Sequence, residues 1–208
     1  MYNISTKRRS LLPSPSSSNN NNDSNSNNDN QNNTDLSLTI ALEKKINLAV
    51  EDFNTDKFYE LILRNRLSNE NTLTICDYVI TMKREVNPRL NSKKYTIQFL
   101  AELSKTVGIE KKFIDMTRED VLLYLDKCRK LENQDPLHKW IGSYNTKFAV
   151  LSRFFKWLYY PNVEDPNRRS ELSKLERKPD CIIGISRLKR KAVTNLPISG
   201  HKKMIWYF

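Results

Sequence analysis

The sequence is poor in residues that build several familiar kinds of site. It has four glycines, three cysteines and two histidines among 208 residues. No glycine stands in a phosphate-binding pattern such as GxxxxGK[ST] or GxGxxG. Cys76, Cys128 and Cys181 are scattered, which favours neither a zinc site nor a disulfide framework. We therefore expect no metal, no cofactor and a reducing, cytoplasmic compartment.

Long apolar runs are also missing. None approaches the roughly 18 residues that span a bilayer. Near the N-terminus, Lys7, Arg8 and Arg9 are followed only by Leu11 and Leu12 before a proline, so the apolar segment of a signal peptide is absent. We expect no membrane partner and no small-molecule substrate.

Basic residues are abundant. The chain has 35 Lys and Arg against 24 Asp and Glu, a net charge of +11. Such a balance favours an acidic partner, with nucleic acid first. Few glycines and many helix formers favour an all-α domain.

The composition divides the chain into four parts. Residues 1–35 are rich in Asn and Ser and have little to bury, so we expect a disordered tail. Residues 36–66 carry apolar residues at helical spacing, and this lead-in either packs on the domain or pairs with another chain. Residues 67–165 form the helical domain. Residues 166–208 form a basic arm and a divergent tail.

The segment Trp140–Tyr160 has the clearest helical period. Its residues at 100° spacing place Phe154 in an apolar arc and Arg153 and Lys156 on the opposite face, beside small residues. Ser143 is a candidate N-cap, and Pro161 ends the helix. The cationic face is either simply solvated or contacts an anionic partner.

Three further helices are expected before it. The first is capped by Asn71 or Thr72, the second opens at Ser92 and ends at Gly108, and the third opens with a capping box at Thr117–Asp120. Their apolar stripes include Tyr95 in the second helix. The expected core comprises Leu73, Val79, Phe99, Leu103, Val121, Leu125, Phe148, Leu151, Phe154 and Leu158.

Residues 166–191 have more basic than acidic residues, two prolines and few large apolar groups. This composition favours an extended segment. It is either an ordinary charged linker or a segment that follows a phosphate backbone and adds charge without fixed geometry.

Four segments resemble a known module. They are Tyr95–Leu103, MTREDVLLYLDKCRK from Met116, DPLHKWIGSYN from Asp135 and LSRFFKWLYYP from Leu151. In this order and spacing they resemble the core-binding domain of tyrosine recombinases. Within that family, the residues of the last two segments look closest to those of the archaeal integrases. The resemblance extends from about Asn71 to Lys191 and implies a SAM-like domain of four to five helices.

The resemblance implies one half of a clamp around double-stranded DNA. In that family a separate C-terminal domain carries a tyrosine nucleophile, assisted by Arg, Lys and His residues, for phosphoryl transfer. The family's HxxR element is absent, because Ile141 follows His138 and Met204 follows His201 at the third position. We therefore expect no enzyme activity and take Tyr207 as incidental. A frameshift or gene fragment would explain the divergent end.

These observations predict a non-catalytic DNA-binding module related to recombinases, serving DNA integration or recombination. The alternative is a helical protein-interaction domain that assembles with recombinase protomers. The candidate DNA-binding residues are Lys93, Lys94, Lys139, Lys147, Arg153, Lys156, Arg187, Lys189, Arg190 and Lys191.

Overall fold

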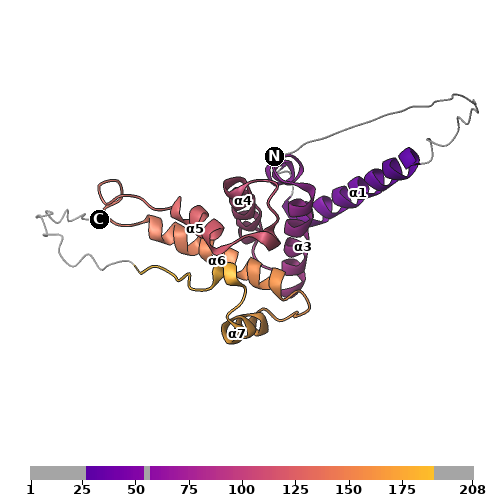
Figure 1. Ribbon diagram of the computed structural model, residues 1–208. Helices are drawn as coiled ribbons and strands as arrows, with labels where there is room; N and C mark the ends of the chain where they lie inside the picture. Colours follow the sequence, from indigo (N-terminus) through magenta and orange to yellow (C-terminus); the bar gives the residue numbers. More distant parts are fainter. Residues whose placement is uncertain (1–26, 54–56, 190–208) are drawn as a thin grey trace, which may run out of the picture. The chain divides into compact units, whose positions relative to one another are not determined.

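The structure is a computed structural model that describes residues 27–53 and 57–189, with side chains from residue 39 onward. All regular elements in these ranges are helical, so the predicted all-α class is confirmed (Figure 1). The α-helices are α1 (Asn27–Val50), α2 (Phe58–Asn65), α3 (Asn69–Glu85), α4 (Leu90–Val107), α5 (Arg118–Asp126), α6 (Trp140–Tyr159) and α7 (Pro166–Glu176). Three short 3-10 helices are η1 (Glu51–Phe53), η2 (Phe113–Asp115) and η3 (Asp180–Ile182).

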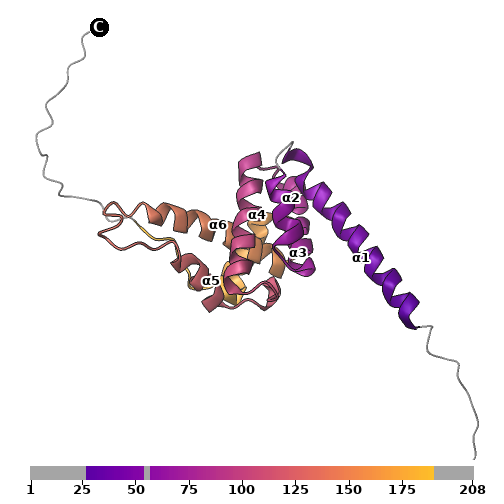
Figure 2. The ribbon, with the colours of Figure 1, turned by 90° about the horizontal axis from the view of Figure 1, so that it is seen from above.

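Helix α4 is central to the part of the chain that follows residue 38. It packs against α2 and α3 from the preceding sequence and against α5 and α6 from the following sequence. Figures 1 and 2 both show α4 beside α3 and α6. Helix α6 packs in turn against α3, α5, α7 and η3. These two helices therefore position most of the surface discussed below.

The core is centred on Phe154 of α6, whose side chain is fully buried. Its ring makes edge contacts with Tyr78, Phe113 and Phe155, at centroid distances of 5.0 to 5.2 Å. The structure confirms the predicted burial of Val79, Leu103, Val121, Leu125, Leu151 and Phe154. Four other predicted core residues, Leu73, Phe99, Phe148 and Leu158, are only half-buried.

The predicted cap of α3 is wrong, and the error explains Leu73. Ser68 is the N-cap, and its hydroxyl accepts a hydrogen bond from the Asn71 backbone. Asn71 and Thr72 are instead buried within the helix. The Asn71 amide group donates to the carbonyls of Ile109 and Lys111 and accepts from the Phe113 backbone N–H, at 3.0 to 3.2 Å. Polar residues thus occupy part of the face that we assigned to apolar ones.

The start of α6 is also earlier than expected. The helix begins at Trp140, so Ser143 lies inside it. The Asp135 carboxylate caps it from the preceding loop by accepting a hydrogen bond of 2.8 Å from the Trp140 backbone. Two other expected helix ends are confirmed. Thr117 and Asp120 form a complete capping box, and Gly108 ends α4 with a positive φ of 129°.

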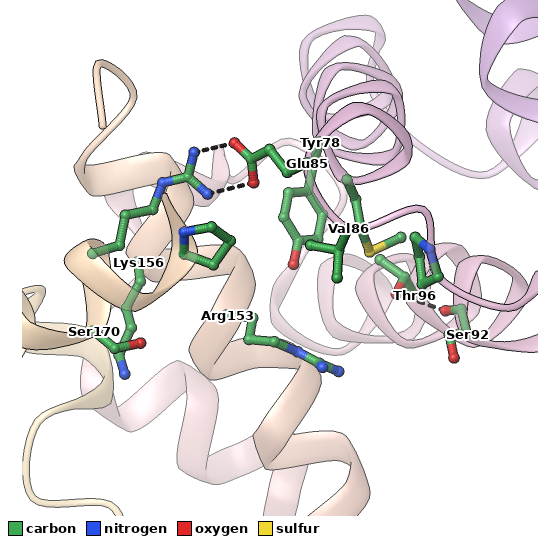
Figure 3. A pocket seen from close by; sticks show the side chains of 12 residues that line it. Tyr78, Glu85, Val86, Ser92, Thr96, Arg153, Lys156 and Ser170 are labelled. Atoms are coloured by element: carbon green, nitrogen blue, oxygen red, sulfur yellow. Dashed lines mark hydrogen bonds and ion pairs between the residues drawn. The ribbon is translucent and has the colours of Figure 1, made fainter. Parts of the chain in front are cut away.

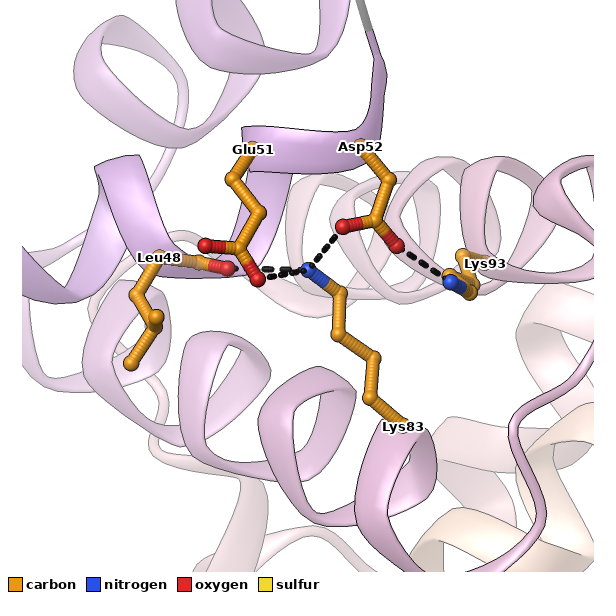
Figure 4. Close-up of polar contacts among 5 residues, drawn as sticks. All are labelled: Leu48, Glu51, Asp52, Lys83 and Lys93. Carbon is orange, nitrogen blue, oxygen red and sulfur yellow. Dashed lines mark hydrogen bonds and ion pairs between the residues drawn. The ribbon is translucent and has the colours of Figure 1, made fainter.

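Residues 39–53 of the lead-in pack on the domain, as the first of the two alternatives predicts. Ile46 and Ala49 are fully buried, and Phe53 is nearly so. Lys83 of α3 donates to the Leu48 carbonyl at 2.9 Å and to the Glu51 and Asp52 carboxylates at 3.2 and 3.0 Å (Figure 4). The other oxygen of Asp52 accepts from Lys93 of α4. Both packing and ion pairs therefore join this segment to α3 and α4.

Helix α1 begins at Asn27, before the expected end of the disordered segment 1–35. Extending an existing helix adds one hydrogen bond per ordered residue, whereas nucleation is the costly step. The pattern of Leu42 and Ile46 is therefore a sufficient reason for a helix that continues upstream into polar sequence. The remainder of the predicted tail, residues 1–26, lies outside the described residues.

The first part of the predicted arm, residues 166–182, is folded rather than extended. Asp165 caps α7, with Pro166 at the first helical position, where its missing N–H has no cost. Arg169 of α7 is buried and forms a bidentate ion pair with Glu85 of α3. Further on, Cys181 and Ile182 are buried against the core. The boundary predicted at residue 165 therefore falls inside one folded unit.

Candidate nucleic-acid interface

An open groove lies between the first half of α4, one face of α6 and the segment around Arg187. Its cavity volume is about 320 Å³. Ser92 and Tyr95 come from α4, one turn apart. The α6 side chains recur at intervals of three or four residues, in part as adjacent pairs, so they share a helix face. They are Asn145, Thr146, Ala149, Val150 and Arg153.

Asn145 fixes the C-terminal segment beside this groove. Its side-chain amide donates to the Leu188 carbonyl, and its side-chain oxygen accepts from the Leu188 backbone N–H, both at 2.9 Å. The Leu188 side chain packs on the core. Arg187 therefore has a defined backbone position next to α6, contrary to our expectation of an arm without geometry.

Arg153 and Arg187 give the groove two positive charges. Both are exposed, and within residues 39–53 and 57–189 no carboxylate lies within ion-pair distance of either. Ala149 and Thr146, which are small, line the same groove. Small residues allow a phosphate backbone to approach the helix closely. We expected the α6 face and the arm to be separate cationic groups, but the structure places one arginine of each in a single groove.

A smaller cavity of about 110 Å³ adjoins the groove and shares Ser92 and Arg153 with it. Figure 3 shows Arg153 and Lys156 on one side and Tyr78, Val86 and Ser92 on the other. Its volume is below the roughly 300 Å³ typical of small-molecule sites. The cavity therefore extends the cationic surface from the groove toward α7, where it is lined by Pro166 and Ser170.

Lys156 is held in an unfavourable setting for a cation. Its side chain is half-buried, and this burial, followed by repulsion from Lys174 of α7, lowers its pKa. Burial disfavours the charged form, and a neighbouring like charge adds to the effect. An anion bound beside Lys156 and Lys174 would relieve both costs.

Three of the predicted DNA-binding lysines are engaged within the fold. Lys93 is buried and paired with Asp52, so its side chain is occupied within the fold. Lys147 pairs with Glu102 at 2.8 Å and lies over the Tyr124 ring, 4.5 Å from its centroid. Lys94 lies over the rings of Phe53 and Tyr59. Lys147 and Lys94 therefore both have intramolecular partners.

Of the remaining predicted DNA-binding residues, Lys139 and Lys189 do not line the groove. Lys139 is exposed at the start of α6 and lines a separate hollow together with Lys127, Lys130 and Lys147. Lys189 is exposed at the end of the described segment. Arg190 and Lys191 lie outside the described residues. Of the ten candidates, Arg153, Lys156 and Arg187 are the ones that the two adjoining cavities bring together.

Sequence reasoning missed Tyr95 and Asn145 as site residues. Tyr95 was assigned to the buried stripe of α4, but its side chain is 50% exposed. Asn145 lies within the segment DPLHKWIGSYN, yet nothing in that segment signals a partner 43 residues later. A pattern of local spacing cannot reveal such a long-range hydrogen bond.

Comparison with known proteins gives no identification: no family model, no curated protein and no solved structure matches the chain. In the part of the chain that the structure describes, no helix has the length and apolar content needed to cross a bilayer. The same residues contain no cluster of three or more His, Cys, Asp or Glu side chains arranged to bind a metal.

Proposed function

We propose that this chain is a DNA-binding module without catalytic activity of its own, related to the core-binding domains of tyrosine recombinases. The observation that carries the proposal is the groove in which Arg153 and Arg187, from segments distant in sequence, lie beside small and polar residues. A cationic groove of this kind suits the phosphate backbone of double-stranded DNA. The net charge of +11 acts in the same direction. The proposal includes action within a cytoplasmic compartment on integrated or recombining DNA.

The test measures binding of a random-sequence duplex by fluorescence anisotropy at two salt concentrations. Affinity should fall steeply with salt, and the double variant Arg153→Ala/Arg187→Ala should bind more weakly. Its slope of log K against log salt should also flatten by about 0.9 for each phosphate that the variant no longer neutralises.

A matched control removes the same charge elsewhere. Arg129 and Arg168 are exposed and pair with Asp126 and Glu171 on their own segments. The variant Arg129→Ala/Arg168→Ala should bind nearly as tightly as the unmodified chain. Equal losses in the two double variants would assign the binding to net charge alone. No binding in any salt would refute the proposal.

A second candidate, assembly with recombinase protomers or another protein, is favoured by a different surface. Phe58 of α2 is 48% exposed. It borders a hollow between α2 and α4 that also includes Ile62, Ala101 and Lys105. If this hollow is the principal site, Phe58→Ser should abolish partner binding, and that binding should depend only weakly on salt.

A further inference from the structure

Tyr95 departs from the pattern of its own helix. Helix α4 buries Thr96, Ile97 and Leu100 among other residues, whereas the Tyr95 side chain is 50% exposed. A large aromatic ring in water is not unusual by itself. This ring, however, borders the same groove as Arg153 and Arg187. A residue that departs from the pattern of its own helix is most informative where it lies at a candidate site.

The ring of Tyr95 is supported from one side. It stacks on Phe99, one turn later in α4, with the centroids 5.8 Å apart and the planes 13° from parallel. Lys147 lies 5.3 Å from the Phe99 centroid and is itself paired with Glu102. A chain of contacts from Glu102 to Phe99 thus fixes the plane of the Tyr95 ring before any ligand arrives. Pre-organisation of this kind lowers the entropy lost on binding.

An aromatic ring in a cationic groove is the arrangement that binds unpaired nucleotides. Bases stack on the ring while the cations contact the backbone. The bases of a continuous duplex are stacked on each other, so their faces cannot reach a protein side chain without disrupting the helix. The groove's volume of about 320 Å³ is near the lower end for ligand sites, which suits one base rather than a strand.

We propose that the groove accepts one unpaired base of a DNA duplex, stacked on Tyr95, with Arg153 and Arg187 on the adjoining phosphates. This inference rests on the proposed DNA-binding function and names the form of DNA that the site prefers. The Ser92, Asn145 and Thr146 side chains border the same groove. Of these, the Ser92 hydroxyl offers a hydrogen-bonding group to the base edge or the sugar, because Asn145 holds Leu188 and the Thr146 hydroxyl donates to the Gly142 carbonyl.

The test compares two duplexes that differ in a single extra nucleotide. One is fully paired, and the other has one unpaired 2-aminopurine, a fluorescent base whose emission falls on stacking. The unmodified chain should bind the second duplex more tightly and quench its emission. Tyr95→Ala should weaken binding of that duplex by about 5- to 150-fold, the range for removal of one base–aromatic stack. It should leave binding of the paired duplex nearly unchanged.

Two variants serve as controls. Tyr95→Phe keeps the ring and should retain both affinity and quenching. Tyr159→Ala removes another exposed tyrosine, 43% exposed at the end of α6 and outside the groove, and should have no effect. Circular dichroism and thermal melting of each variant confirm that it is folded.

The outcomes separate this inference from the function on which it rests. Equal affinity of the unmodified chain for both duplexes, or equal losses on both with Tyr95→Ala, would overturn the stacking site while leaving DNA binding intact. Loss of quenching in Tyr95→Phe would assign the effect to the hydroxyl and also overturn it. Absence of binding to either duplex would overturn the proposed function itself.

Discussion

The Asn145 side chain and the Leu188 backbone form two hydrogen bonds of 2.9 Å, across 43 residues of sequence. This pair is what attaches the segment of Arg187 to α6. Asn145→Ala removes both bonds and leaves the polar groups of Leu188 without their partner, at a cost of about 1–3 kcal/mol in the free energy of unfolding.

The local effect of Asn145→Ala should exceed the global one. We expect limited trypsin digestion to cut after Arg187 and Lys189 faster in this variant than in the unmodified chain, because the segment opens more often. Asn145→Asp keeps the acceptor but loses the donor and should be intermediate. Unchanged cleavage rates in both variants would contradict the assignment of Asn145 as the attachment.

The Asp52 carboxylate joins the lead-in to two lysines, one of which is buried. Asp52→Ala leaves Lys93, 5% exposed, without its ion-pair partner. We expect a loss of about 2–3 kcal/mol in denaturant unfolding. This is less than the 3–5 kcal/mol of fully buried pairs, because the Asp52 side chain is 35% exposed. Glu51→Ala, which affects only Lys83 at a more exposed position, should cost under about 1 kcal/mol.

Low pH should weaken the ion pairs that Asp52 forms with Lys93 and Lys83. The hydrogen bond from Lys93, opposed by burial and assisted by Lys83, holds the pKa of Asp52 below its ordinary value of 3.8. A carboxylate with a depressed folded-state pKa contributes stability that is complete above the unfolded pKa and is lost as pH falls through the folded pKa. Thermal melting below about pH 4 should therefore show a steeper loss for the unmodified chain than for Asp52→Ala. Parallel curves would exclude this linkage.

Removal of the central aromatic side chain should be the most damaging single change in the core. Phe154 is fully buried among three other rings. Phe154→Ala should cost about 3–5 kcal/mol in the free energy of unfolding, since the cavity cannot fully collapse. Leu175→Ala provides the comparison, because Leu175 is 81% exposed and its loss should stay within about 0.5 kcal/mol. Similar losses of stability at both positions would contradict the buried position of Phe154 in α6.

Lys156 should show opposite effects on stability and on binding. Its charge is disfavoured by burial and by Lys174, so Lys156→Met should keep the thermal midpoint or raise stability by up to about 1 kcal/mol. DNA affinity should fall at the same time. Lys105→Met, at an exposed position in the last turn of α4, should instead lose a favourable helix-dipole interaction. A stability loss at Lys156 with unchanged DNA binding would show that its role is purely structural.

The fold class and several helix ends could be predicted from the sequence, because these depend on local chemistry. Gly108 and the capping box at Thr117 and Asp120 are examples. It failed at Asn71 and Lys93, since polar residues at those positions are buried against partners that lie 40 and 41 residues away in sequence. Periodicity treats a polar residue as exposed and has no means of recognising such a partner.

For the site, the sequence indicated the cations but not their arrangement. Arg153 and Arg187 were assigned to two separate surfaces, and the Asn145 hydrogen bonds that unite them have no local signature. Tyr95 was assigned to the apolar stripe of its helix because its spacing fits that stripe, whereas the packing of α4 leaves it at the groove.

The position of Phe154 has a consequence for folding during synthesis. Tyr78 and Phe113, two of the rings in contact with it, are both made before α6, whereas Phe155 belongs to the same helix as Phe154. The nascent chain can form α3 and α4 early, but the centre of its core stays unfilled until the ribosome has released Phe154. Up to that moment the aromatic side chains face solvent, and the incomplete domain presents the kind of apolar surface that chaperones bind.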